Sequence, residues 1–311
     1  MLPWIVFTLL ILALLALDLG VFHRKTHSVG VREALGWSAF WISLAMLFNG
    51  WLYWARGPQA GTEFLAGYLI EKSLSVDNIF VFLTLFSYFK VPSQYQHRVL
   101  FLGVLGALVM RGAMIAAGAA LLDRFSWIIY AFGGFLILTG VQMARKTDHG
   151  MDPARNPVVR LVRKLMPVTD SYHGRSFLVR VNGAWAATPL LLVVLVVEVT
   201  DVVFAVDSIP AIFAVTQDPF LVWTSNVFAI LGLRSLYFAL AGVMDRFVYL
   251  KYGLAGVLVF VGGKMCASGV YHMSAWVSLG VIAALLGGSI AASFSASRPR
   301  AAMPARAGSA A

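Results

Sequence analysis

The chain has 311 residues, of which 60% are hydrophobic and only 12% are charged, and its formal net charge is +10. A composition this apolar excludes a soluble globular protein of this length and predicts an integral membrane protein. The single cysteine, Cys266, excludes a disulfide framework and a thiolate metal cluster within one chain.

Apolar segments recur along the chain with short polar breaks between them. Because a helix needs about 20 largely apolar residues to cross the hydrocarbon core, we predict an all-α, polytopic bundle of about nine transmembrane helices. It forms a single domain over residues 1–294, followed by a disordered tail over 295–311 that is rich in Ala, Ser, Pro and Arg. The predicted spans are 2–22, 34–55, 63–89, 99–122, 126–144, 187–215, 221–243, 248–268 and 273–294.

The first span is interpreted as a retained helix, because it lacks the basic start and the small-residue cleavage site of a signal peptide. Lys and Arg concentrate in the odd-numbered loops and the tail, whereas the even-numbered loops carry almost none beyond Arg56 and Arg124. By the positive-inside rule we expect the odd loops and the C-terminus in the cytoplasm and the N-terminus outside. This distribution explains the positive charge by topology and argues against a nucleic-acid partner.

The fifth loop, residues 145–184, is the most basic. Its segment "VVRLVRKLM" alternates apolar and basic residues at roughly helical spacing, as a helix lying on an anionic membrane leaflet would. An ordinary basic loop explains the same residues, and both interpretations stay open.

Two parts of the chain repeat each other. The first unit is helices 3–5, about residues 63–144, and the second is helices 6–8, about 187–268. Since each unit has three helices, the second must enter the membrane from the opposite side. Inverted repeats of this kind are common in secondary transporters, whose substrate site lies where the copies meet. The matched positions are Arg111 with Arg234, the Asp-Arg-Phe at 123–125 with that at 245–247, Glu71 with Asp201, Asp77 with Asp207, and Asn78 with Ser208.

Acidic side chains lie within the two matching helices, although a carboxylate in the bilayer costs at least about 2.5 kcal/mol and is tolerated mainly where it faces a cavity or a partner. At about 100° per residue, Glu71 and Asn78 share one helix face, as do Glu198, Asp201 and Ser208. Asp77 and Asp207 point elsewhere on a straight helix. The candidate metal ligands are Glu71, Asp77, Asn78, Glu198, Asp201, Asp207 and Ser208.

Pro210 suggests how the outlying acids join the others. A proline cannot donate to the carbonyl of Val206, so we expect it to loosen and bend the sixth span. The bend would turn Asp201 and Asp207 toward one cavity and offer the freed carbonyl as a ligand.

All these donors are oxygen atoms, which suit hard divalent ions such as Mg²⁺, Ca²⁺ and Mn²⁺. The six histidines map to loops or helix ends, which counts against zinc, copper or nickel. Physical chemistry alone leaves the three hard ions open.

A structural network is the competing interpretation, in which basic residues within the spans simply neutralise the acids. Asp18 is then a helix-end acid and Asn49 a helix-packing amide, whereas in a binding site both are secondary donors. The secondary candidates are Asp18, Asn49, Lys72, Arg111 and Arg234.

The segments "LDLGVFHRKTHSV", "EKSLSVDNIFVF" and "EVTDVVFAVDSIPAIFAVT" resemble the signature segments of the TerC/Alx family of bacterial integral membrane proteins. The resemblance covers nearly the whole chain except the tail. It implies an inner-membrane protein linked to manganese export or to tellurium resistance.

These features predict a transporter that exports Mn²⁺ through an acidic site between the inverted repeats, with no permanently bound cofactor. The alternative is a membrane-anchored scaffold in tellurite or another stress response, which would dock a cytoplasmic partner on the basic fifth loop and transport nothing itself. We do not expect an enzyme, because the chain has no G-x-S-x-G, H-E-x-x-H or dinucleotide motif.

Overall fold

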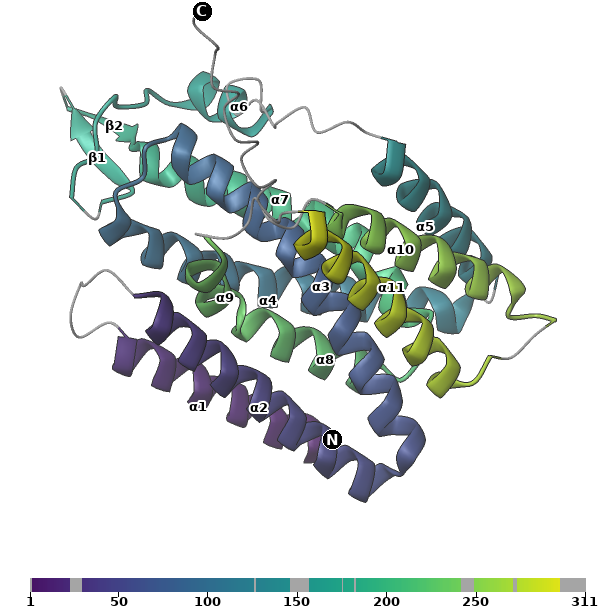
Figure 1. Ribbon diagram of the computed structural model, residues 1–311. Coiled ribbons are helices and arrows are strands. Elements are labelled where there is room, and N and C mark those ends of the chain that lie inside the picture. Colours follow the sequence, from purple (N-terminus) through teal and green to yellow (C-terminus); the bar gives the residue numbers. More distant parts are fainter. Residues whose placement is uncertain are drawn as a thin grey trace, which may run out of the picture.

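The computed structural model is an α-helical membrane protein, as its composition predicts (Figure 1). It describes residues 2–22, 30–125, 127–145, 157–174, 176–181, 183–241, 249–270 and 273–296. The elements are α1 (Leu2–Phe22), α2 (Val31–Arg56), α3 (Pro58–Tyr88), α4 (Ser93–Arg124), α5 (Ile128–Arg145), α6 (Pro157–Leu165), β1 (Leu178–Val181), β2 (Ala184–Ala187), α7 (Pro189–Phe213), α8 (Pro219–Leu231), α9 (Leu233–Leu240), α10 (Leu250–Ala267) and α11 (Ala275–Ala296).

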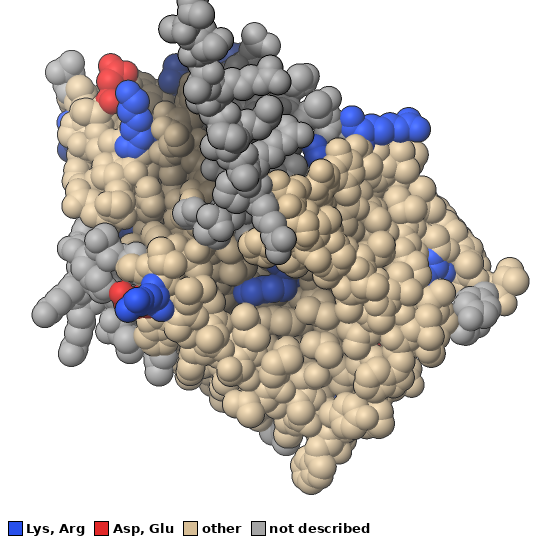
Figure 2. Space-filling model, in the orientation of Figure 1, with Lys and Arg blue, Asp and Glu red and all other residues tan. Residues whose placement is uncertain are grey.

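Six helices in the described part of the chain are long and apolar enough to cross a membrane, namely α2, α4, α5, α7, α10 and α11, and the bent pair α8 and α9 adds a seventh if it is one span. A broad stretch of the surface carries few charged residues (Figure 2). Large apolar side chains, among them Trp54, Leu47 and Val109, are exposed on the surface of the bundle. In a membrane protein such side chains face lipid, so the exposed apolar surface needs no protein partner.

Two flanking groups of helices enclose a central group. In Figure 1, α1 and α2 run along one flank and α5, α10 and α11 lie on the other, with α3, α4 and α7 between them. α3 packs against α7, α8 and α11, and α4 packs against α7 and α8. The polar residues of the two acidic segments therefore lie in the middle of the bundle.

Alternate loops gather at opposite ends of the bundle. At one end, the Tyr172 hydroxyl donates to the carbonyl of Phe89 at 2.7 Å, and the N–H of Tyr249 donates to Oγ of Ser293 at 3.0 Å. We call this the odd-loop end. At the other end, Arg56 pairs with Asp218 at 2.9 Å. Burial raises the pKa of Tyr172 to about 12, so its hydroxyl stays protonated and able to donate at any physiological pH.

The seventh predicted span is interrupted. The prediction of one continuous helix over 221–243 is wrong, because α8 ends at Leu231, α9 begins at Leu233 and the axis bends by 40° between them. The intervening Gly232 packs closely, since a Cβ placed on it would lie 3.2 Å from Cβ of Trp41. The second Asp-Arg-Phe, at 245–247, lies outside the described residues.

The fifth loop contains more structure than its sequence indicates. Of the two interpretations left open for this segment, the structure has the helix, α6 over residues 157–165, and its Val159 and Val162 are buried against α7. A β-hairpin over 178–187 follows, with a positive φ at Gly183 in its turn. This hairpin was not predicted from the sequence, because four-residue strands with little alternation give almost no periodic signal.

The helices α5 and α10 cross at glycines. A Cβ on Gly262 would lie 2.6 Å from the carbonyl oxygen of Gly133, and one on Gly140 would lie 2.8 Å from that of Ala255. Small residues allow two helix backbones to approach this closely in a membrane.

Replacing Gly262 with alanine is therefore expected to force the two helices apart and to lower the free energy of unfolding by about 1–3 kcal/mol. The matched control is Gly263→Ala, since a Cβ at Gly263 meets nothing within 4 Å. Thermal unfolding in detergent measures both. Equal unfolding temperatures for the two variants would contradict the close crossing.

Candidate functional site

A buried arginine joins the two acidic segments. Arg111 of α4 is only 1% exposed, and its guanidinium makes two hydrogen bonds to Asp201 of α7. Its Nε donates to Oδ2 at 3.0 Å and its Nη2 donates to Oδ1 at 2.9 Å. Its Nη1 donates to Oε1 of Glu71 of α3, and lies 3.4 Å from Oγ of Ser208 of α7. A planar fork of donors suits this pairing with two carboxylates.

Asn78 completes the group, because its Nδ2 donates to Oδ1 of Asp201 at 3.4 Å. We call Glu71, Asn78, Arg111, Asp201 and Ser208 the central cluster. Glu71 and Asn78 lie on one face of α3, and Asp201 and Ser208 lie on one face of α7, as helical geometry predicts.

The central cluster contains acceptor atoms that lack hydrogen-bond partners. Oε2 of Glu71 and Oδ1 of Asn78 are both buried without one. Two carboxylates also face one guanidinium, so acid exceeds base. Buried oxygen atoms of this kind are costly, and an entering cation would satisfy them.

Glu198 of α7 lies beside the central cluster. Its side chain packs against the face of α4 that carries Gly106. A Cβ on Gly106 would collide with the Glu198 carboxylate where it lies in this structure, so the glycine leaves room for it there. Oε2 of Glu198 is buried without a partner, and the carboxylate is close enough to interact electrostatically with Asp201. Glu198 thus adds a third acid near Asp201 that Arg111 does not bind.

The structure does not bring every predicted ligand together. Asp207 lies away from the central cluster, half-buried beside Thr139 of α5. Pro210, which was expected to loosen and bend this span, lies inside α7, and the helix continues through it to Phe213. On an unbroken helix Asp207 lies six residues, or about 240°, around from Asp201, which keeps the two carboxylates apart.

Two predicted residues fall where the side chains are not described. Asp77 belongs to α3 and Asp18 to α1, but the placement of both side chains lies outside the described part of the structure. Asn49 of α2 is described, and its Oδ1 is buried without a partner. Among the described residues, no three side chains of His, Cys, Asp or Glu are grouped to hold a metal ion.

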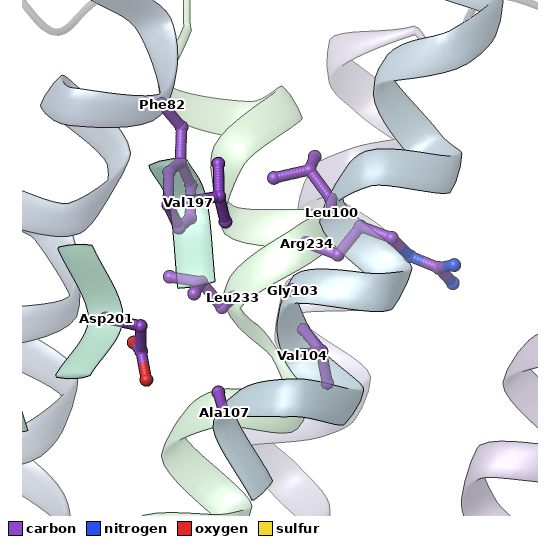
Figure 3. Close-up of a pocket in the computed structure, with 9 residues that line it drawn as sticks. All are labelled: Phe82, Leu100, Gly103, Val104, Ala107, Val197, Asp201, Leu233 and Arg234. Atoms are coloured by element: carbon purple, nitrogen blue, oxygen red, sulfur yellow. The ribbon is translucent and has the colours of Figure 1, made fainter. Parts of the chain in front are cut away.

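The two other basic candidates lie near the break between α8 and α9. Nζ of Lys72 donates to the carbonyl of Ala229 at 3.3 Å, in the last turn of α8, where a helix carries partial negative charge. Arg234 of α9 lines a small cavity, with room for about one water molecule, together with Asp201. In Figure 3, the Arg234 guanidinium points away from Asp201.

The sequence matches a known family of integral membrane proteins, as its apolar helices predict. Residues 56–301 match the family described as "Integral membrane protein TerC family". The chain belongs to the TerC family.

Relatives of this TerC protein match it along almost their whole length. It is 56% identical to "Uncharacterized membrane protein STKORF319" of Myxococcus xanthus, covering 95% of this chain and 92% of that one. It is 50% identical to "Putative membrane-bound redox modulator Alx" of Escherichia coli strain K12, covering 91% of each chain. A membrane protein of Rickettsia bellii is 41% identical over 91% of this chain and 94% of its own. No solved structure matches.

The TerC match contains the whole central cluster but begins at Arg56, so α1 and nearly all of α2 precede it. The structure also adds a residue that the sequence analysis missed. Asn226 of α8 is fully buried, and neither its Nδ2 nor its Oδ1 has a partner. An amide within an apolar span is the signal that would have found it.

Helical position indicates where Asn226 points. Val222, one turn earlier, packs with Ile115 of α4 and Ile212 of α7, and Ala229, one turn later, faces Lys72 of α3. Asn226 therefore lies on the side of α8 that faces the three helices of the central cluster.

Proposed function

We propose that this TerC protein exports a hard divalent cation, with Mn²⁺ favoured, through a site built on the central cluster. The observation that carries the proposal is the convergence of Glu71 and Asp201, from α3 and α7, on one buried arginine, with neighbouring oxygen atoms left without partners. Carboxylate, amide and hydroxyl oxygens are the donors that hard divalent ions prefer. Manganese among these ions, and export as the direction, follow from the family resemblance.

Helix packing supports nine spans arranged as two inverted three-helix units. The first unit is α3, α4 and α5, and the second is α7, the bent pair α8 and α9, and α10. α3 packs on α8 just as its counterpart α7 packs on α4, and α5 packs on α10. A twofold relation between the units produces these reciprocal contacts.

Loop placement supports the orientation. The basic third and fifth loops meet at the odd-loop end, which we assign to the cytoplasm of the bacterial inner membrane. The C-terminus is then cytoplasmic and the N-terminus outside.

Arg111 gives the proposed site its resting state. Its guanidinium neutralises the two carboxylates while no cation is bound. An entering divalent ion competes for the same oxygens, so the arginine must withdraw when the ion binds. Protons are the proposed counter-ion, because a buried carboxylate next to another acid readily takes up a proton.

Manganese flux in proteoliposomes tests the proposal. The purified protein is expected to move Mn²⁺ across the bilayer, and to move it faster when a pH gradient is imposed. Glu71→Gln removes one charge of the central cluster and is expected to reduce the flux at least about tenfold, the lower end of the loss seen when a group that supports a metal site is removed.

Asp218→Asn is the matched control, because Asp218 caps α8 at the opposite end of the bundle and an asparagine keeps the cap. Its flux should equal that of the native protein. Absence of flux in all three proteins would contradict transport. Deletion of residues 157–187 would then test the scaffold function. If this deletion abolished a stress phenotype in cells, the scaffold function would replace transport. The redox role in the name of the Alx relatives would be the first such role to test.

A further inference from the structure

Two small cavities share Arg234. The first, shown in Figure 3, lies among α3, α4, α7 and α9 and is lined by Asp201 of the central cluster, by Val104 and by Leu233. The second lies among α2, α4 and α9 and is lined by Trp37, His97 and Ser235. Arg234 and α9 separate the two.

The cavities lie in series along the bundle. On α4, the second cavity is lined by His97, while the first is lined by residues 100–107, which are up to three turns further from the odd-loop end. His97 stacks on Phe238, and Gln96 accepts from Tyr237 at 3.3 Å, which places the second cavity close to that end. A path through both cavities would lead from the odd-loop end to Asp201.

The bend at Gly232 holds Arg234 between the cavities. Trp41 of α2 and Nζ of Lys72 of α3 both pack close to Gly232, so the backbone just before Arg234 is in contact with both helices. A discontinuous helix beside a buried site is the usual construction of ion pathways through membrane proteins. The cationic Arg234 repels another cation in a space this small and desolvated.

We propose that Arg234 is the inner barrier of a cation pathway that runs from the odd-loop end, through the two cavities, to Asp201. The inference rests on the proposed function, and it adds the route of the divalent cation and the residue that controls entry. Movement of the Arg234 side chain joins the two cavities, and its return closes them.

Thiol labelling tests the pathway without measuring flux. In a Cys266→Ser background, single cysteines replace Ser235 in the second cavity, Val104 in the first, and Val109, which is 69% exposed on the outer side of α4. The probe is a membrane-impermeant, cationic methanethiosulfonate, applied to vesicles of known orientation from the odd-loop side.

Ser235→Cys is expected to react readily, Val104→Cys slowly, and Val109→Cys not at all, because lipid covers it. Arg234→Gln should speed the reaction of Val104→Cys about tenfold, since it removes a close like charge. Arg234→Lys, which keeps the charge, should leave the slow rate unchanged, and Mn²⁺ should slow the reaction by occupying the path.

An equal rate for Val104→Cys with Arg234 and with Arg234→Gln would overturn the proposal, as would labelling of Val104→Cys only from the opposite side. If Arg234→Gln does not fold, Arg234→Met, which has a similar length, replaces it. The expected labelling pattern in a protein that carries no Mn²⁺ flux would support the pathway and contradict the proposed function, so the two can fail separately.

Discussion

Arg111→Met is expected to lower the free energy of unfolding by about 3–5 kcal/mol, because it leaves two buried carboxylates facing each other without their counter-charge. Mn²⁺ should restore much of this loss, since the ion supplies the positive charge that the arginine provided. At a concentration 100 times its dissociation constant, a ligand that binds only the folded state adds about 2.7 kcal/mol. Thermal unfolding in detergent, with and without Mn²⁺, measures both effects.

The matched control is Arg124→Met, on the same helix but exposed at its end. It should change stability little and should give no additional response to Mn²⁺. Acidification provides a further check on Arg111→Met. Protonation of one carboxylate removes the repulsion between the two, so the stability difference from the native protein should shrink as the pH falls. A variant that is as stable as the native protein and indifferent to Mn²⁺ would contradict the central cluster.

Asp201→Asn is expected to abolish Mn²⁺ flux, whereas Asp207→Asn should retain most of it. Both acids lie on α7 and belong to the same acidic segment. Only Asp201 contacts Arg111 and lines a cavity, while Asp207 lies beside Thr139 of α5. Flux in proteoliposomes, measured at equal protein content, compares the two.

Loss of flux in both variants would mean that Asp207 also takes part in transport. Since Asp207 lies away from the central cluster, α7 would then have to rearrange during transport. Full flux in Asp201→Asn would remove the central cluster from the pathway. The pair therefore tests whether location, rather than charge alone, decides the role of an acid in this helix.

Helical periodicity predicted the central cluster well. Glu71 and Asn78 were placed on one face of a helix, and Asp201 and Ser208 on one face of another. In the structure Glu71, Asp201 and Ser208 contact Arg111, and Asn78 donates to Asp201. A rigid helix makes such a prediction reliable, because residues three, four or seven apart must lie on one side of it.

Effects that depend on the surroundings of a helix were predicted less well. Pro210 was expected to loosen and bend α7, and the helix continues through it, with residues 208–213 buried. The break lies instead at Gly232, where Trp41 and Lys72, both distant in sequence, fix the bend. Asn226 was missed because its own segment shows an amide in an apolar span but not which neighbouring helices that amide faces.

Cys266 of α10 lies where this helix crosses α5. It is exposed, its sulfur is 3.9 Å from the carbonyl oxygen of Tyr130 on α5, and it adjoins Gly133 at the glycine crossing. A small fluorophore attached to this natural thiol would sense any sliding of α10 along α5. The native sequence thus provides its own reporter for relative motion of α5 and α10, and a change in emission on adding Mn²⁺ would record that motion in real time.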